Sequence, residues 1–284
     1  MGQVEPSDST LSTFTASDGD NLAMQDWPLP DGLKLRGVVV LVHGLGEHAG
    51  RYDHVARRLN SWGFAVRGYD HYGHGESGGV RGALSRDSRL VDDLADIVES
   101  TRLRMDEGAP LFVLGHSMGG LVAACFAAQG SPKIEGLVLS SPVFDAGLSP
   151  FQKLLVAILP RIVPNFTVGN GLDANFISHD STVVAAYKSD PRVHSKISGR
   201  LARFIATGGP AIVARASEWN IPTLLMYAGQ DKLVNPAGSR AFAAKAPRTA
   251  VTTRCFEDLF HEILNEPDNE AVFATLRQWL DARF

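Results

Sequence analysis

The chain has 284 residues, of which 44% are hydrophobic and 20% are charged, and this composition is typical of a globular protein with a sizeable core. The formal net charge of −4 and the lack of a long basic run argue against a nucleic-acid partner. The two cysteines, Cys125 and Cys255, do not suffice for a disulfide framework, so a reducing compartment is the simpler environment.

Residues 1–11 are polar and acidic, with neither a positively charged start nor an apolar run. We therefore predict a disordered N-terminus rather than a signal peptide. No run of about 18 apolar residues follows, which argues against a transmembrane helix. We expect a cytoplasmic protein, with peripheral membrane contact at most.

From residue 12 onward, apolar runs typical of strands alternate with segments that have helical spacing of apolar residues. The first two strands flank a turn and predict a hairpin. The predicted strands are 14–16, 22–27, 37–43, 64–70, 111–114, 136–141, 222–228 and 250–256. The predicted helices are 52–61, 87–105, 121–128, 238–245 and 269–283. This alternation predicts an α/β fold with a mostly parallel, doubly wound sheet.

The alternation breaks between residues 144 and 218, which carry helical patterns, several prolines and no convincing long strand. We interpret 144–218 as a helical cap inserted between two strands of the sheet. Residues 12–143 and 219–284 then form one core domain.

The motif Gly115-His116-Ser117-Met118-Gly119 separates a predicted strand from a predicted helix. Gly-x-Ser-x-Gly in this context is the nucleophile-elbow motif. The turn is so tight that side chains in place of the two glycines would collide with neighbouring backbone. It lifts the serine hydroxyl above the sheet and places the Met118 amide at a helix N-terminus. Ser117 is thus the predicted nucleophile of a hydrolase.

A serine hydroxyl needs a general base, and in this architecture the chain order is serine, acid, histidine. Three histidines follow Ser117, namely His179, His194 and His261. The first two fall in the insertion, whereas His261 follows the last predicted strand, where active-site loops lie. We predict His261 as the base.

The base needs an acid that orients its ring. Asp231 follows the strand at 222–228 and is the preferred candidate, while Asp145 follows the preceding strand and remains a rival. Asp258 is too close to His261 in the sequence to be a natural partner.

An oxyanion hole needs a second backbone amide besides that of Met118. The loop His43-Gly44-Leu45-Gly46 follows an early strand, and Leu45 is the predicted donor. The alternative is that this segment is only a turn.

Four histidines, His43, His48, His71 and His74, raise the question of a metal site. Their spacing matches no known ligand pattern, so we expect no metal and no other cofactor.

Residues 43–52 read His-Gly-Leu-Gly-Glu-His-Ala-Gly-Arg-Tyr. Together with residues 70–77, 115–120 and 260–266, this stretch resembles the monoacylglycerol lipases, which are lysophospholipase-like α/β-hydrolases. The similarity extends over nearly the whole chain from residue 14, the insertion included.

The resemblance implies an α/β-hydrolase fold in which the insertion is a cap over an acyl pocket. It also implies Ser117, Asp231 and His261 as the catalytic triad, and the amides of Leu45 and Met118 as the oxyanion hole. Such enzymes often have a small residue where this chain has Leu45, and we expect the larger side chain to reshape the pocket.

An apolar stripe follows one face of a predicted helix in the insertion. Either it packs on the core, or it walls an apolar tunnel and touches lipid surfaces. A tunnel would select long acyl chains, because each buried methylene contributes about 0.8 kcal/mol. The stripe comprises Phe151, Leu154, Leu155, Ile158, Leu159 and Ile162.

Phe151, Leu155 and His194 are candidate substrate contacts in the insertion. Glu47 and Arg51 either meet the polar alcohol end of the substrate or form a surface ion pair.

The expected function is cleavage of carboxylic esters by a serine hydrolase, with monoacylglycerol-type lipids as substrates and an acyl-enzyme on Ser117. One alternative is a general carboxylesterase or other acyl hydrolase of the same fold, and another is a ligand-binding module with slow turnover. The expected partner is a small lipid or ester, and the sequence does not indicate an oligomeric state.

Overall fold

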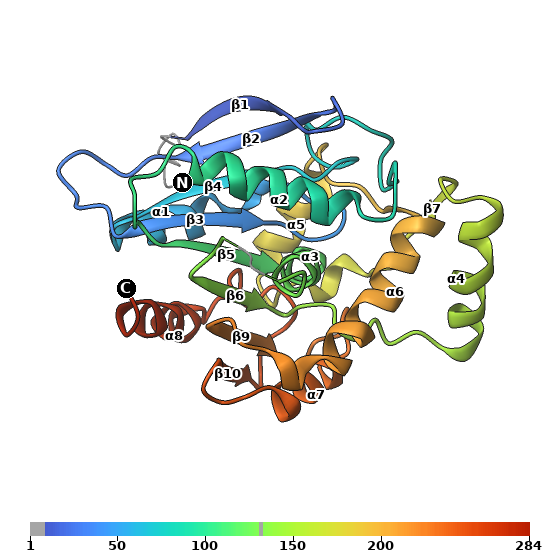
Figure 1. Cartoon of the computed structure of the whole chain (residues 1–284). Coiled ribbons are helices and arrows are strands. Elements are labelled where there is room, and N and C mark those ends of the chain that lie inside the picture. Colours follow the sequence, from blue (N-terminus) through green and yellow to red (C-terminus); the bar gives the residue numbers. More distant parts are fainter. Residues whose placement is uncertain (1–8, 131–132) are drawn as a thin grey trace.

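The computed structural model describes residues 9–130 and 133–284, and Figure 1 shows a central sheet between two layers of helices. In these residues one sheet has eight strands in the order β1-β2-β4-β3-β5-β6-β9-β10. The pairs β1/β2 and β2/β4 are antiparallel, and the other pairs are parallel. The strands are β1 Thr10–Thr15, β2 Asn21–Trp27, β3 Gly37–Val42, β4 Phe64–Tyr69, β5 Leu111–His116, β6 Gly136–Ser140, β9 Thr223–Ala228 and β10 Val251–Phe256.

The helices connect these strands on both faces of the sheet, as the predicted alternation requires. Those of the core are α1 Asp53–Ser61, α2 Arg89–Arg102, α3 Met118–Ala127, α7 Ala237–Lys245 and α8 Glu270–Asp281. Between β6 and β9 lie α4 Pro150–Ile162, α5 Ser181–Ser189 and α6 Gly199–Ala214. Short 3-10 turns are η1 Ala49–Tyr52, η2 Ala174–Phe176 and η3 Ala216–Glu218.

The parallel strands bury both faces because successive side chains point to opposite sides of the sheet. On β3, Val40 and Val42 belong to the apolar layer of α2 and α3, whereas Val39 and Leu41 belong to the layer of α1 and α8. A strand covered on both sides reads as a continuous apolar run, which is why β3 and β5 were recognisable in the sequence.

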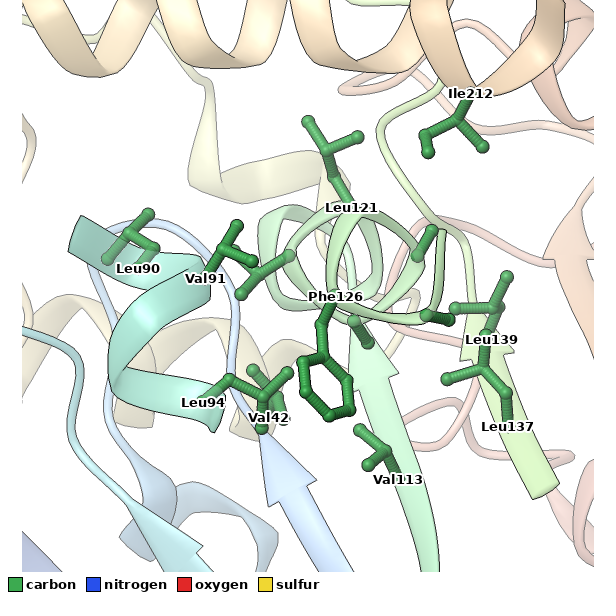
Figure 2. Packing of buried hydrophobic residues seen from close by; sticks show 14 of the residues in the cluster. Val42, Leu90, Val91, Leu94, Val113, Leu121, Phe126, Leu137, Leu139 and Ile212 are labelled. Atoms are coloured by element: carbon green, nitrogen blue, oxygen red, sulfur yellow. The ribbon is translucent and has the colours of Figure 1, made fainter. Parts of the chain in front are cut away.

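Helix α3 is buried on all sides and is accordingly apolar all round. Figure 2 shows Phe126 of this helix pointing toward Val113 of β5, while Leu121 points to the side on which α6 carries Ile212. The helix that follows Ser117 is thus held between the sheet and the insertion, which gives the serine a rigid support.

The structure differs from the sequence prediction at the N-terminus and in the insertion. Strand β1 begins at Thr10, so residues 10 and 11 are paired with β2 rather than disordered; residues 1–8 lie outside the described part of the chain. The insertion also contains a small antiparallel sheet of β7 Thr167–Gly169 and β8 Lys196–Ser198, which was not predicted. Strands of three residues are too short to show an alternating pattern.

Helix α4 contains Pro160 and continues through it to Ile162. Figure 1 shows α4 beside α6 and away from the central sheet. Accordingly, Leu154, Ile158 and Ile162 on one face of α4 are exposed.

Candidate active site

Ser117 occupies the turn between β5 and α3 with φ 54° and ψ −118°, a conformation that is strained for a residue with a side chain. The flanking glycines allow the chain to pass close by. A Cβ on Gly115 would lie 2.5 Å from the Gly119 carbonyl oxygen, and one on Gly119 would overlap the carbonyl oxygens of Val42 and His43. The predicted elbow is therefore confirmed in its geometry, and both glycines are required by close backbone contacts.

The last residue of β6 and the segment that follows it hold the strained turn from the other side. The Ser117 N–H donates to the Ser140 carbonyl oxygen at 2.9 Å, and the Val143 N–H donates to the Ser117 carbonyl oxygen at 3.2 Å. Because both peptide groups of Ser117 are bonded, the surrounding fold stabilises a backbone conformation that the serine alone would not keep.

His261 and Asp231 complete a hydrogen-bonded chain with the serine. His261 Nε2 lies 2.9 Å from Ser117 Oγ, and His261 Nδ1 lies 2.6 Å from Asp231 Oδ2. The other carboxylate oxygen, Oδ1, accepts the N–H groups of Leu233 and Val234 at 2.9 Å each. This places a base beside the hydroxyl and a fixed acid behind the base, as serine nucleophiles require.

Asp231 and His261 each stabilise the charged form of the other side chain. Burial alone would lower the pKa of His261, but the charge and hydrogen bond of Asp231 outweigh it, so the net pKa is raised. Burial would raise the pKa of Asp231, but His261 and the two N–H donors of the following turn hold it below its ordinary value. Asp231 is thus ionised, its Oδ2 accepts the proton on His261 Nδ1, and Nε2 is free to accept the serine proton.

The rival residues lie elsewhere. The carboxylate of Asp145 accepts hydrogen bonds from the Asn235 side-chain amide at 2.7 Å and from the Gly147 N–H at 2.9 Å. The His179 ring stacks on Phe260 with centroids 3.6 Å apart and contacts the Glu266 carboxylate. Neither Asp145 nor His179 takes part in the hydrogen-bonded chain of Ser117, His261 and Asp231.

The amides of Leu45 and Met118 have no hydrogen-bond acceptor among the described residues. Leu45 follows β3 and Met118 is the first residue of α3, and both residues line cavity space next to Ser117. Free backbone N–H groups beside a nucleophile are suited to bind a developing oxyanion.

His43 orients the Leu45 amide, a part that the sequence analysis missed. Its Nε2 accepts the His71 N–H at 2.9 Å, so Nδ1 carries the proton and donates to the Gly44 carbonyl oxygen at 2.8 Å. The Gly44 carbonyl and the Leu45 N–H belong to one planar peptide unit, so fixing one directs the other. Burial lowers the pKa of His43 to about 3, which keeps it neutral. A histidine at the end of a buried strand, directly before glycine, was the available signal.

Of the four histidines considered for a metal, His48 contacts the Asp190 carboxylate, and the other three contact one another and the backbone. The rings of His43 and His71 have centroids 4.5 Å apart, and His71 Nε2 lies 3.1 Å from the His43 carbonyl oxygen. Burial depresses the pKa of His71 and of His74 well below the ordinary value. Over residues 9–130 and 133–284, no group of three or more His, Cys, Asp or Glu residues is placed to hold a metal ion.

Two cavities meet at the nucleophile. The larger, of about 620 Å³, is mostly apolar, and the smaller, of about 300 Å³, is more polar. Ser117, Leu45, Asn170 and Leu172 line both. The carbonyl of a bound ester would lie where an apolar and a polar compartment join. The apolar cavity is further lined by Met118, Val143, Ala146, Leu148, Val156, Val163, Phe166, Val168, Ile197, Ala202 and Ile205.

Among the candidate substrate contacts, Glu47 and His194 line the polar cavity. His194 Nδ1 accepts the Lys196 N–H at 3.1 Å, so Nε2 carries the proton and donates to the Gly73 carbonyl oxygen at 3.1 Å. Arg51 is not among the described residues that line either cavity, and its guanidinium instead pairs with Glu47 and Glu262. These pairs are buried, so neither of the two alternatives for Arg51 describes it.

The described side chains of the apolar stripe on α4 do not line the cavity. Leu154, Ile158 and Ile162 are exposed, while Gln152 and Val156 line the apolar cavity. The side chains of Phe151, Leu155 and Leu159 lie outside the described part of the structure. The cavity wall and the exposed face are therefore two different sides of one helix.

A nucleophile elbow followed along the chain by an acid and a histidine, all at the carboxyl edge of a mostly parallel sheet, defines the α/β-hydrolases. The chain belongs to the serine aminopeptidase S33 family, whose model matches residues 34–268. It is 38% identical to a monoacylglycerol lipase of Mycolicibacterium smegmatis over an alignment of 248 residues. The alignment covers 86% of this chain and 88% of that lipase.

Solved structures of two lipases are also similar to this chain in fold and sequence. A monoacylglycerol lipase of Paleococcus ferrophilus superposes with a TM-score of 0.81 at 33% identity, over 93% of this chain and 99% of its own. A monoglyceride lipase of Saccharomyces cerevisiae, in complex with a substrate analog, gives a TM-score of 0.88 at 26% identity, over 99% of this chain and 98% of its own.

Proposed function

We propose that this chain, a serine ester hydrolase of the α/β-hydrolase fold, cleaves monoacylglycerol-type lipids to fatty acid and glycerol through an acyl-enzyme on Ser117. The observation that carries the proposal is the position of the Ser117–His261–Asp231 chain at the junction of an apolar and a polar cavity. The names of its relatives, monoacylglycerol and monoglyceride lipases, support the same substrate class.

The reaction follows from the geometry. Ser117 Oγ attacks the ester carbonyl while His261 Nε2 takes the hydroxyl proton, and the amides of Leu45 and Met118 bind the oxyanion. The C–O bond to the alcohol then breaks, and His261 gives the proton to the leaving oxygen. A water molecule, deprotonated by His261, attacks the acyl-enzyme, and the fatty acid leaves as Ser117 recovers its proton.

The two cavities assign the two ends of the substrate. An acyl chain in the apolar cavity gains about 0.8 kcal/mol per buried methylene, so long chains are favoured over acetyl. A glycerol group in the polar cavity meets hydrogen-bonding side chains, among them Asn170, Lys188 and Ser195. A general carboxylesterase of the same fold would not need an apolar cavity of about 620 Å³.

Aminopeptidase activity, which the family description names, is less well supported by the polar cavity. Binding of a peptide α-ammonium group needs a carboxylate that is not already paired. Among the described residues that line this cavity, the acidic ones are Glu47 and Glu262, and both are paired with Arg51. A neutral polyol fits such a lining better than a cationic amine.

The test is release of fatty acid from monooleoylglycerol by the purified chain. Ser117→Ala should abolish turnover and labelling by a fluorophosphonate, while Ser61→Ala, at the exposed end of α1, should leave both unchanged. Faster hydrolysis of leucine p-nitroanilide than of the ester would reject the proposed substrate class. Full ester turnover by Ser117→Ala would reject the acyl-enzyme.

We further propose that the insertion docks on lipid surfaces. Five apolar side chains of α4 and the following segment are 45–70% exposed, and two of them, Phe166 and Val168, also line the apolar cavity. A patch of this kind marks an interaction site, and here it adjoins the acyl cavity. Within the described residues, no helix has the length and apolar character needed to cross a bilayer. The patch comprises Leu154, Ile158, Ile162, Phe166 and Val168.

Sedimentation with phosphatidylcholine vesicles tests this docking. The double variant Ile162→Asp, Phe166→Asp should bind at least about tenfold more weakly, because two apolar side chains no longer leave water. Leu103→Asp is the matched control, since Leu103 is 83% exposed but lies at the end of α2. Equal binding of the double variant and the wild type would contradict lipid docking.

A further inference from the structure

A buried arginine lies between the loop that carries the oxyanion amide and the loop that carries the base. The Arg51 side chain is 10% exposed, and its two terminal nitrogens donate to the two carboxylate oxygens of Glu262 at 2.8 Å each. The same guanidinium also pairs with Glu47 Oε2. One cation thus bridges two carboxylates whose residues are 215 positions apart (262 minus 47).

Glu47 connects this cation to the oxyanion loop. Its Oε1 accepts the Gly44 N–H at 2.5 Å and the Tyr52 hydroxyl at 2.7 Å, and the residue is 2% exposed. Gly44 precedes Leu45, so Glu47 holds the N–H side of Gly44 while His43 holds its carbonyl side. The direction of the Leu45 amide depends on both contacts.

Glu262 connects the cation to the base, because it directly follows His261. Its N–H donates to the Ile177 carbonyl oxygen at 2.8 Å, and its Oε2 also accepts the Asn265 side-chain amide at 2.7 Å. The Tyr187 ring of α5 covers the guanidinium, with its centroid 4.7 Å from the central carbon of Arg51. The insertion therefore closes the cluster from the side of the substrate.

We propose that Arg51 is a positioning residue: through Glu47 and Glu262 it holds the Leu45 amide and the His261 ring at the separation that the oxyanion intermediate requires. The proposal rests on the function proposed above. Without the guanidinium, two buried carboxylates would face each other, and like charges in a medium of low dielectric constant repel strongly. The two loops would then move apart.

The kinetic consequence is specific. Arg51 does not line the cavities, so substrate binding depends little on it, whereas oxyanion stabilisation acts only in the transition state. A displacement of about 1 Å costs about 100-fold in rate. We expect Arg51→Met to lower kcat for p-nitrophenyl butyrate about 100-fold and to change KM less than about threefold.

Three further variants complete the experiment. Arg51→Lys keeps the charge but not the bidentate contact with Glu262. Its kcat should be at least about tenfold higher than that of Arg51→Met. Glu47→Gln keeps an acceptor for the Gly44 N–H while removing one charge, and should lower kcat about tenfold. The matched control is Arg58→Met, because Arg58 forms a surface ion pair with Glu270 and should matter less than about twofold.

Circular dichroism and thermal melting establish that each variant is folded. A folded Arg51→Met enzyme with kcat within about threefold of the wild type, or with a loss confined to KM, would overturn the positioning role. If Arg51→Met does not fold, Glu262→Gln decides, since an unchanged kcat in this variant would equally overturn it. If the wild type hydrolyses no ester, the proposed function fails instead, and the rate of Ser117 labelling by a fluorophosphonate then provides the same comparison among the variants.

Discussion

Oδ2 of Asp231 lies 2.6 Å from Nδ1 of His261, and the remaining oxygen of this carboxylate accepts two backbone N–H groups of the turn that follows. The carboxylate is thus held in place and leaves the imidazole with one orientation. That orientation directs Nε2 to the serine hydroxyl and stabilises the imidazolium formed when the proton is transferred.

Replacement of the Asp231 carboxylate should strongly lower the rate of ester hydrolysis. In Asp231→Asn the ring loses its proton acceptor, and we expect kcat for ester hydrolysis to fall about 10⁴-fold. Asp145→Asn is the control, because Asp145 was the rival candidate and instead binds the Asn235 side chain; it should retain more than about half of the wild-type kcat. The opposite ranking of the two variants would assign the acid to Asp145.

The pH dependence follows from the raised pKa of His261. The base must be neutral to accept the serine proton, so kcat/KM should fall as the pH drops through a pKa above the ordinary value of 6.5. Asp231 is the main influence that raises this pKa, and Asp231→Asn should move the acid limb of the residual activity to lower pH. A pH profile of kcat/KM from pH 4 to 9 measures both. A wild-type limb centred below the ordinary value of 6.5 would contradict the raised pKa of His261.

Filling the apolar cavity should shorten the preferred acyl chain. Ala202 lines this cavity, and in Ala202→Trp the ratio of kcat/KM for palmitoyl over butyryl p-nitrophenyl esters should fall about 100-fold, since space for several methylenes is lost. Ala157→Trp is the control because Ala157 is exposed on α4. If both variants keep the wild-type ratio, the acyl chain binds elsewhere.

The glycines of the elbow should tolerate no side chain. In Gly119→Ala the new methyl group overlaps the carbonyl oxygens of Val42 and His43, so β3 and α3 must separate. We expect a loss of at least about 2 kcal/mol in the free energy of unfolding, together with loss of activity. Gly169→Ala has open space around the added carbon and should be within about 0.5 kcal/mol of the wild type. Urea denaturation followed by circular dichroism provides both values.

The elements of the core were predictable because their signals are local. The apolar runs of β3 and β5 and the helical spacing of α2 need no distant partner to be recognised. Ser117 and His261 were also predictable, since the elbow motif and the position after the last strand constrain them. The strands β7 and β8 were missed because three residues carry no period.

The phase of α4 shows the limit of such patterns. The sequence shows an apolar stripe, but it does not distinguish a stripe that faces a cavity from one that faces water or lipid. In the structure Val156 lines the cavity while Leu154 and Ile158 are exposed, because α4 packs on α6 and stands away from the sheet.

By itself, the sequence determined the class of fold and singled out Ser117 and His261, whose side chains lie 2.9 Å apart in the structure, because these inferences depend on short motifs and on chain order. The tertiary structure showed that Asp231, preferred over Asp145 from the sequence, contacts His261, and it alone revealed the contact of His43 with the Gly44 carbonyl and the pairing of Arg51 with both Glu47 and Glu262. Each of these depends on contacts between residues that are far apart along the chain, and the strength of a buried charge contact is set by the neighbours that exclude water from it.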